Sequence, residues 1–207
     1  AIALPYGAVI PWWKRAFDLT VAVVLLVLLS PLLLVIAAYI RTASPGPALF
    51  FQQRVGAMGE TFWIWKFRSM RTDTDQSRHA AHLLEVSQSG STPSKLDTSR
   101  DLIPGGAWLR RCSLDELPQL VNVLRGEMSI VGPRPDVLEP HHYDAWALER
   151  FQVTPGVTGL WQVSGKNSST WEEMLRLDVT YAQRRSPWLD AQILLRTIPL
   201  LFGGNSS

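Results

Sequence analysis

An apolar run at positions 19–40 constrains this chain more than any other feature, because Ser30-Pro31 interrupts it near its midpoint. At about 1.5 Å of rise per residue, a helix of this length is just long enough to cross the hydrocarbon core of a bilayer. A proline inside a helix removes one backbone hydrogen bond and bends the helix axis. The run therefore predicts a membrane helix that is bent at its centre.

Basic residues flank the apolar run on both sides: Lys14 and Arg15 precede it, and Arg41 and Arg54 follow it. Loops on the cytoplasmic side of a membrane carry an excess of lysine and arginine. Both ends of the run are therefore expected on the cytoplasmic side, which requires a re-entrant helix that enters and leaves through one face. Proline also occurs in helices that span the bilayer, so the pattern alone leaves a spanning helix open.

The charge of the chain is divided unevenly along its length. Residues 1–71 hold seven Lys/Arg and two Asp/Glu, a net charge of +5, whereas the remaining residues carry −3. The positive part surrounds the apolar run, as expected for contact with membrane lipids that have anionic headgroups. No basic helix with interleaved aromatic residues is present, which argues against nucleic acid as a partner. The single cysteine, Cys112, excludes an internal disulfide and fits a reducing cytoplasm.

Composition divides the chain into three parts. Residues 1–18 are predicted as an interfacial segment, residues 19–41 as the membrane helix, and residues 42–207 as a cytoplasmic domain. A domain of about 160 residues is large enough to form its own hydrophobic core. The fold class is predicted as α/β and mostly α, with amphipathic helices at the membrane interface.

Local patterns predict the elements of this domain. Runs 48–55 and 61–67 are rich in aromatic and branched residues and flank a glycine-containing turn, so they predict a β-hairpin. Residues 72–106 are rich in serine, threonine and aspartate, which predicts a mobile loop with a short helix near 78–86. Apolar residues at helical spacing predict three helices, at 108–125 with its end at Gly126, at 170–184 and at 188–202. The last helix is expected to lie on a bilayer through a broad apolar face formed by Ile193, Leu194, Ile198, Leu201 and Phe202.

Two adjacent carboxylates stand in the sequence Ser113-Leu114-Asp115-Glu116, which reads as a capping box in which Ser113 and Glu116 close the start of a helix. Pro118 weakens this interpretation, because proline is tolerated in the first turn of a helix and would fit better if the helix began at Asp115. Either start places two carboxylates at the positive end of a helix. A carboxylate in this position could attack phosphorus or bind Mg²⁺.

Basic residues in three other segments could serve the same chemistry. The prolines of Gly132-Pro133-Arg134-Pro135 restrict the backbone around Arg134, which suits bidentate binding of phosphate, although the segment could also be a rigid surface turn. Arg110 lies shortly before the carboxylates, and Lys66 and Arg68 end the second hairpin strand. Cationic side chains together with carboxylates are the groups that phosphoryl transfer with a divalent metal requires.

The remaining candidate residues give weaker evidence of function. The turn-rich loop at 155–162 contains Trp161 and Gln162. The loop could bind a nucleobase, or it could simply contain a buried tryptophan. Asp178 falls in an apolar helical stripe, which favours a structural ion pair. None of the four histidines is predicted to bind metal: His79, His82, His141 and His142.

Taken together, seven segments in this order resemble the bacterial sugar transferase family, the monotopic phosphoglycosyl transferases that begin glycan assembly on a polyprenol carrier. The resemblance extends from about Lys14 to Phe202. The segments are Lys14-Arg15-Ala16-Phe17-Asp18, Ser30-Pro31, Gln53-Arg54-Val55-Gly56, Lys66-Phe67-Arg68-Ser69-Met70, Ser113-Leu114-Asp115-Glu116-Leu117-Pro118-Gln119, Gly132-Pro133-Arg134-Pro135 and residues 155–162.

The resemblance implies a fold and an activity. It implies a re-entrant helix bent at Ser30-Pro31 in the bacterial inner membrane, with the catalytic domain on the cytoplasmic face. It also implies a Mg²⁺-dependent exchange in which Asp115 attacks the β-phosphorus of a UDP-sugar and releases UMP. Polyprenol (undecaprenyl) phosphate then takes the sugar-1-phosphate from the aspartyl intermediate, which is the first membrane step of surface glycan biosynthesis.

The resemblance also implies roles for single residues and partners. Asp115 is the expected nucleophile and metal ligand, and Glu116 is the second carboxylate, which assists with metal or protons. Arg134 matches a phosphate-binding arginine of the family and Arg110 a basic residue near the two carboxylates. The residue patterns described above add Lys66, Arg68 and Gln162 as candidates for binding substrate or phosphate. The expected partners are the UDP-sugar, polyprenol phosphate, membrane lipids and, in a homodimer, a second copy of the chain.

The chain departs from the family pattern in two places. The family commonly has Thr-Arg-Val-Gly where this chain reads Ile103-Pro104-Gly105-Gly106, so one basic group that could bind nucleotide is missing. Residues 1–18 leave no room for the spanning helices of longer members, so the chain is expected to be a short member or an excised catalytic portion. Two other functions stay open: a non-catalytic membrane scaffold for glycan-assembly enzymes, and a phosphohydrolase acting on lipid diphosphates.

Overall fold

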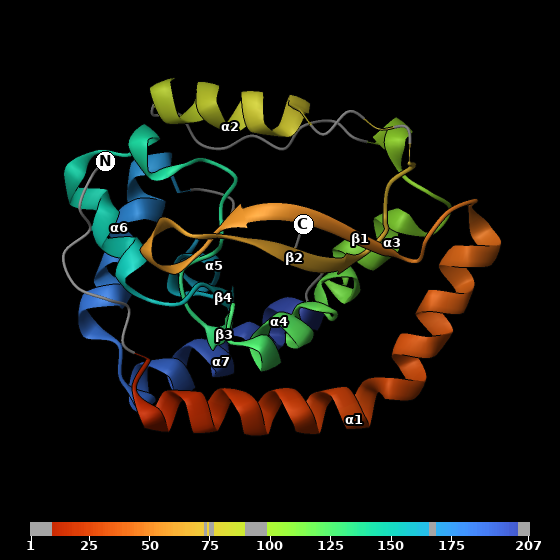
Figure 1. Ribbon diagram of the computed structural model, residues 1–207, viewed down its shortest axis with the longest axis horizontal. Helices are drawn as coiled ribbons and strands as arrows, with labels where there is room; N and C mark the ends of the chain where they lie inside the picture. Colours follow the sequence, from red (N-terminus) through yellow and green to blue (C-terminus); the bar gives the residue numbers. More distant parts are fainter. Residues whose placement is uncertain (1–9, 73, 75–76, 90–98, 166–168, 203–207) are drawn as a thin grey trace.

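The chain folds into a mostly helical structure with two small two-stranded sheets, as Figure 1 shows for the computed structural model. The structure describes residues 10–72, 74, 77–89, 99–165 and 169–202. The long helix α1 (Trp12–Ala43) runs along one edge of the molecule, and the β1–β2 hairpin lies between α1 and the short helix α2 (Ser77–Ser89). The predicted class, an α/β fold that is mostly α, is confirmed in this coarse form.

Helix α1 begins at Trp12, inside the segment that was predicted to be a separate interfacial lead-in, and it continues through Pro31 to Ala43. By length and composition it is long and apolar enough to cross a membrane. Figure 1 shows that its axis changes direction about midway along its length, which is the expected effect of an interior proline. Many of its apolar side chains face outward, including Val27, Leu28, Leu34 and Val35. The bend predicted from Ser30-Pro31 is therefore present.

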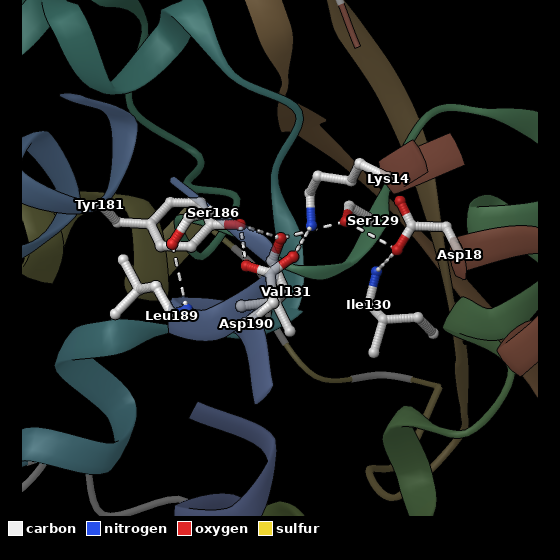
Figure 2. A network of polar contacts seen from close by, with 9 residues as sticks. All are labelled: Lys14, Asp18, Ser129, Ile130, Val131, Tyr181, Ser186, Leu189 and Asp190. Carbon is white, nitrogen blue, oxygen red and sulfur yellow. Dashed lines mark hydrogen bonds and ion pairs between the residues drawn. The ribbon is translucent and has the colours of Figure 1, made fainter. Parts of the chain in front are cut away.

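Buried polar contacts join the first turns of α1 to the domain, as Figure 2 shows. The Lys14 ammonium lies 2.7 Å from Asp190 Oδ2, and both side chains are less than 5% exposed. Asp190 belongs to α7 (Pro187–Phe202), and its other oxygen accepts a hydrogen bond of 2.8 Å from Tyr181 of α6 (Trp171–Arg184). Arg15 donates to the carbonyls of Val123 and Leu124 at 2.6 and 2.8 Å.

These contacts correct the expectation that Lys14 and Arg15 bind lipid headgroups. Both charges are used to attach α1 to the domain: Lys14 pairs with a carboxylate, and Arg15 bonds to the last turn of α4 (Gln119–Arg125). The sequence could not show this, because a basic residue beside an apolar run gives the same pattern whether its side chain contacts lipid or protein.

Asp18 is attached in a way that predicts a difference between two substitutions. A single oxygen, Oδ1, accepts from both the Ser129 hydroxyl and the Ile130 backbone N–H, each at 3.0 Å (Figure 2). Asp18→Asn keeps an acceptor oxygen there, so the free energy of unfolding should change by less than about 1 kcal/mol. Asp18→Ala leaves the Ile130 N–H buried without this acceptor and should cost about 1–3 kcal/mol. Urea unfolding in detergent micelles measures both, and equal losses would show that these hydrogen bonds contribute little.

The β-hairpin is present where the sequence predicts it. Strands β1 (Leu49–Val55) and β2 (Thr61–Phe67) pair antiparallel, with Leu49 opposite Phe67 and Val55 opposite Thr61. Residues directly opposite each other point to the same side of a sheet. Phe62 and Ile64 on one side of the hairpin join the main hydrophobic core, which places Arg54 and Lys66 on that same, inward side.

The side chain of Asn122 on α4 fixes the hairpin against the helices. Its amide oxygen accepts a hydrogen bond of 3.0 Å from the Trp65 backbone N–H, and its amide nitrogen donates to the Trp63 carbonyl at 2.7 Å. The amide therefore replaces a neighbouring strand for this part of β2. Because Lys66 follows Trp65 directly, the same contact sets the position of the Lys66 side chain.

The single helix predicted over 108–125 is wrong, because the structure divides this stretch into three pieces. Helix α3 (Gly106–Arg111), the 3₁₀ turn η3 (Leu114–Glu116) and α4 follow one another. Ser113 has a φ of 53°, in the left-handed region, and breaks the helix there. The predicted end of α4 is confirmed, because Gly126 has a φ of 83° and closes the helix.

The predicted capping box at Ser113 and Glu116 is also wrong. The Ser113 side chain makes no capping hydrogen bond, and Glu116 contacts Lys66 and Arg134 instead. A capping box is instead present at the start of α6, where Thr170 and Glu173 exchange the two bonds. A sequence pattern of this kind does not show which long-range partner a glutamate will find.

Two parallel strands, β3 (Ser129–Val131) and β4 (Gly156–Thr158), form the second sheet. Gly132, which follows β3, lies against the first residue of β4, since a Cβ at Gly156 would lie 2.0 Å from the Gly132 nitrogen. Only glycine permits this approach of the two backbones. The contact fixes the start of the segment that carries Arg134. Helix α5 (Leu160–Ser164) follows β4.

The remaining elements complete the comparison with the sequence. The 3₁₀ helices are η1 (Ala57–Gly59), η2 (Ser99–Asp101), η4 (Pro140–His142) and η5 (Ala145–Gln152). Helix α2 confirms the short helix predicted near 78–86, although residues 90–98 of the predicted mobile loop lie outside the described residues.

The predicted apolar face of α7 is corrected by the structure. Ile193 is buried in the core and Leu194 packs against it, whereas Ile198 is exposed as predicted, together with Trp188 and Leu195. The side chains of Leu201 and Phe202 lie outside the described ones. The helix is apolar on two sides, so periodicity alone could not tell which side faces the core.

Candidate active site

The two adjacent carboxylates lie in a tight turn between α3 and α4. The left-handed conformation of Ser113 reverses the chain after α3, η3 carries Asp115 and Glu116, and Pro118 leads into α4. Both carboxylates are therefore held by a short, constrained segment and not within a continuous helix. Asp115 is buried, with 8% of the residue exposed.

Glu116 is the centre of an ion-pair cluster with two residues that the sequence predicted for this site. Lys66, at the end of β2, places its ammonium 3.0 Å from Glu116 Oε1. Arg134, from the segment after β3, contacts both carboxylate oxygens of Glu116 through its two terminal nitrogens. Burial alone would raise the pKa of Glu116, but Arg134 and Lys66 outweigh it and hold that pKa well below its usual value. Glu116 is therefore ionised at neutral pH.

Asp115 is in a different electrostatic environment from its neighbour. Burial, followed by the negative charge of Glu116, raises the pKa of Asp115 to about 6, although Lys66, Arg110 and Arg134 act in the opposite direction. The carboxyl group is therefore mostly ionised at pH 7 and mostly protonated at pH 5. Two neighbouring carboxylates whose pKa values are separated by their surroundings commonly have different chemical roles.

The backbone of Arg134 is fixed by Arg150, a buried residue that the sequence did not single out. Arg150 in η5 donates to the Arg134 carbonyl at 2.8 Å and forms an ion pair of 2.8 Å with Asp178 of α6. The structural ion pair expected for Asp178 is confirmed. Arg150 carries no motif that distinguishes it from other arginines, so its role could only be found from the fold.

The structure brings some of the other predicted residues to this cluster. Arg110 on α3 lies close enough to Asp115 to act on its pKa. Gln162 on α5 is buried beside the contact between Gly159 and Gly132, two residues before Arg134. Its amide oxygen has no hydrogen-bond partner among the described residues.

Arg68 does not join the Glu116 cluster. All three of its guanidinium nitrogens bond to the loop that follows α1, with distances of 2.7 Å to the Pro47 carbonyl, 3.0 Å to the Ser44 hydroxyl and 2.8 Å to the Ser44 carbonyl. The structure therefore gives Arg68 a role in holding the end of α1, and its predicted contact with phosphate stays a prediction. Ser30 and Pro31 are exposed and belong to the bend of α1.

A magnesium ion at Asp115 would need ligands from outside the protein. Within the part of the chain that the structure describes, no group of three or more His, Cys, Asp or Glu side chains is gathered. Glu116 is already paired with two cations, so Asp115 is the carboxylate left to act as a ligand. Mg²⁺ is usually held in this way, by one or two carboxylates together with substrate phosphates and water.

A small helical domain with one long apolar helix and a carboxylate pair among basic side chains suggests a membrane-associated protein with a site suited to phosphate chemistry. A sequence profile described as bacterial sugar transferase matches residues 9–204. The chain belongs to the bacterial sugar transferase family.

Curated relatives with similar sequences carry transferase or exopolysaccharide names. The chain is 38% identical over 196 residues to "Galactosyl transferase CpsE" of Streptococcus agalactiae serotype III, a match that covers 94% of this chain and 43% of the relative. It is 39% identical over 189 residues to "Exopolysaccharide production protein ExoY" of Rhizobium meliloti, which covers 90% and 84%. It is 40% identical over 197 residues to "UDP-glucose:undecaprenyl-phosphate glucose-1-phosphate transferase" of Caulobacter vibrioides, which covers 91% and 69%.

Proposed function

We propose that this protein transfers sugar-1-phosphate from a UDP-sugar to polyprenol phosphate through a covalent intermediate on Asp115. The observation that carries the proposal is that the two carboxylates lie in different electrostatic environments. Glu116 is neutralised by Lys66 and Arg134, whereas Asp115 is buried beside these charges with a raised pKa. An ionised carboxylate that is poorly stabilised in its ground state is a better nucleophile, and the nearby cations offset the charge of an incoming phosphate.

The reaction has two displacements at one phosphorus atom. In the first, an Asp115 oxygen attacks the β-phosphorus of the UDP-sugar, and the bond to the bridging oxygen breaks so that UMP leaves with the electron pair. In the second, an oxygen of polyprenol phosphate attacks the same phosphorus and the aspartyl oxygen leaves, which restores the carboxylate. Arg134 and Lys66 would stabilise the negative charge on the transferring group, and the bound Glu116 would keep both cations in position.

Magnesium fits this site as a cofactor shared between Asp115 and the substrate. When bound, it supplies positive charge that polarises the phosphate and offsets repulsion between the phosphate and the carboxylate. Asp115 would be its protein ligand, and Glu116 would remain with Lys66 and Arg134.

The anchor supports a placement of the reaction at a membrane surface, with α1 re-entrant in the inner membrane and the domain on the cytoplasmic face. The bend of α1 and its outward apolar side chains suit a helix that enters and leaves through one leaflet (Figure 1). Trp12 and Trp188 are 82% and 72% exposed near the starts of α1 and α7, as expected for tryptophan at a membrane interface. A polyprenol phosphate headgroup would be presented at this level.

The direct test is to trap the intermediate. Purified full-length chain in nanodiscs is incubated with magnesium and a panel of UDP-sugars that carry ³²P in the β-phosphate, without lipid acceptor, and quenched in denaturant. We expect one UDP-sugar to give labelled protein together with UMP, and subsequent addition of undecaprenyl phosphate to remove the label. Turnover without any labelled protein would exclude the covalent route, and release of inorganic phosphate from lipid diphosphates would instead identify a phosphohydrolase.

A further inference from the structure

Arg54 lies beside the candidate active site without having been assigned to it. It stands near the end of β1 on the inward side of the hairpin, the side that also carries Lys66. The Val55 backbone N–H donates to the Asp136 carbonyl at 2.8 Å, which joins this end of β1 to the segment that carries Arg134. A small hollow between the two segments is lined by Val55, Gly56 and residues 133–135.

The charge of Arg54 is satisfied differently from the charges of Lys66 and Arg134. Those two residues form ion pairs with Glu116, but the hydrogen bond of Arg54 goes from a terminal nitrogen to the neutral amide oxygen of Gln52, at 2.8 Å. Its Nε is buried and has no hydrogen-bond partner among the described residues. A buried donor of a charged group without a partner is costly, unless a ligand completes it.

The surroundings of Arg54 favour an anion. Burial lowers the pKa of Arg54 to about 10, and the charge of Arg134 adds to this effect, while Asp136 and Glu116 act against it. Two guanidinium groups that repel each other at close range are stabilised when a dianion lies between them. The planar fork of arginine is suited to a phosphate group, which can accept two parallel hydrogen bonds.

We infer that Arg54 is a further substrate-binding residue, whose guanidinium group binds a substrate phosphate next to Arg134. The inference rests on the proposed function, because that function supplies the two phosphate sources: the diphosphate of the UDP-sugar and the phosphate of the lipid acceptor. Both present the same chemistry, so the experiment must separate them.

The test uses Arg54→Gln in the full-length chain, purified in nanodiscs, with Arg176→Gln as a matched control. Arg176 has the same kind of side chain, but it is exposed on α6 and pairs with Glu172 within the same helix. One arm measures the dissociation constants of UMP and UDP by calorimetry. The other arm measures the KM for undecaprenyl phosphate at saturating UDP-sugar.

We expect Arg54→Gln to weaken binding in one arm by about 10- to 100-fold, the effect of losing a charge-assisted hydrogen-bond pair, while Arg176→Gln stays within twofold of wild type. A loss in the nucleotide arm assigns Arg54 to the donor, and a loss in the lipid arm assigns it to the acceptor. Unchanged values in both arms, or an equal loss in the control, would overturn the inference. If Arg54→Gln does not fold, Arg54→Lys decides, because it keeps the charge without the planar fork: a loss of threefold or more supports the inference, and wild-type values overturn it.

The two arms also separate this inference from the proposed function. Binding of UMP and UDP is measured without turnover, so it reports on Arg54 even if no UDP-sugar yields a labelled protein. If no UDP-sugar reacts but the binding of UMP and UDP depends on Arg54, only the transferase mechanism is refuted. Normal turnover with no dependence on Arg54 in either arm would refute the role of Arg54 alone.

Discussion

Asp115→Asn should lower the rate of UMP release from the UDP-sugar by at least about 10³-fold, as removal of a catalytic nucleophile does in other enzymes. The asparagine amide has nearly the same shape as the carboxyl group but does not attack phosphorus. Because the folded state raises the pKa of Asp115 to about 6, keeping this group ionised at pH 7 costs stability. Asparagine removes that cost, so the variant should unfold at the same temperature as wild type or at a higher one.

Glu116→Gln is the matched control for this prediction, because it changes the neighbouring carboxyl group in the same way. The pKa of Glu116 is held low by Arg134 and Lys66, so its charge stabilises the fold at pH 7. Glu116→Gln should therefore lower the unfolding temperature, unlike Asp115→Asn. Activity is measured as UMP release, and stability by thermal unfolding in the same nanodiscs. Activity of Asp115→Asn within tenfold of wild type would exclude Asp115 as the nucleophile, and intact glycan assembly in cells would favour the scaffold hypothesis.

Lys14→Met should destabilise the protein by about 3–5 kcal/mol, the usual cost of removing one partner from a buried ion pair. The substitution leaves the Asp190 carboxylate less than 5% exposed without its cation, at the junction of α1 and α7 (Figure 2). Urea unfolding in detergent micelles measures the loss.

The double variant Lys14→Met with Asp190→Leu tests whether the loss comes from the unpaired Asp190 carboxylate. It removes both charges, and Tyr181 keeps the Val131 carbonyl as an acceptor at 2.9 Å, so most of the lost stability should return. If Lys14 served mainly to bind lipid headgroups, Lys14→Met would weaken membrane association and leave unfolding unchanged. That result would contradict the contacts of α1 described above.

Local sequence patterns predicted the elements whose determinants are local. The hairpin, the bend in α1 and the end of α4 at Gly126 follow from residue spacing, proline and glycine. The break at Ser113 could not be predicted, because a left-handed serine is uncommon and nothing in the neighbouring residues requires it.

The sequence indicated which residues form the candidate site but not which of them form ion pairs. Asp115, Glu116, Lys66 and Arg134 were singled out by type, but the sequence could not show that Glu116 would collect both cations and leave Asp115 with a raised pKa. Arg150 was not singled out, and Arg54 was named only beside the apolar run and within a family segment, because the residues that surround them come from distant parts of the chain. The same limit explains Lys14 and Arg15, whose partners lie more than 100 positions away.

Arg15 ties the first turn of α1 to the final carbonyls of α4, while the other end of α4 follows directly from the turn that carries Asp115. Seven helical residues, about 10 Å in length, thus separate the first turn of α1 from the turn that carries Asp115. If α1 lies in a membrane as proposed, the contacts of Arg15 and the two turns of α4 would therefore set how far Asp115 stands from the lipid surface.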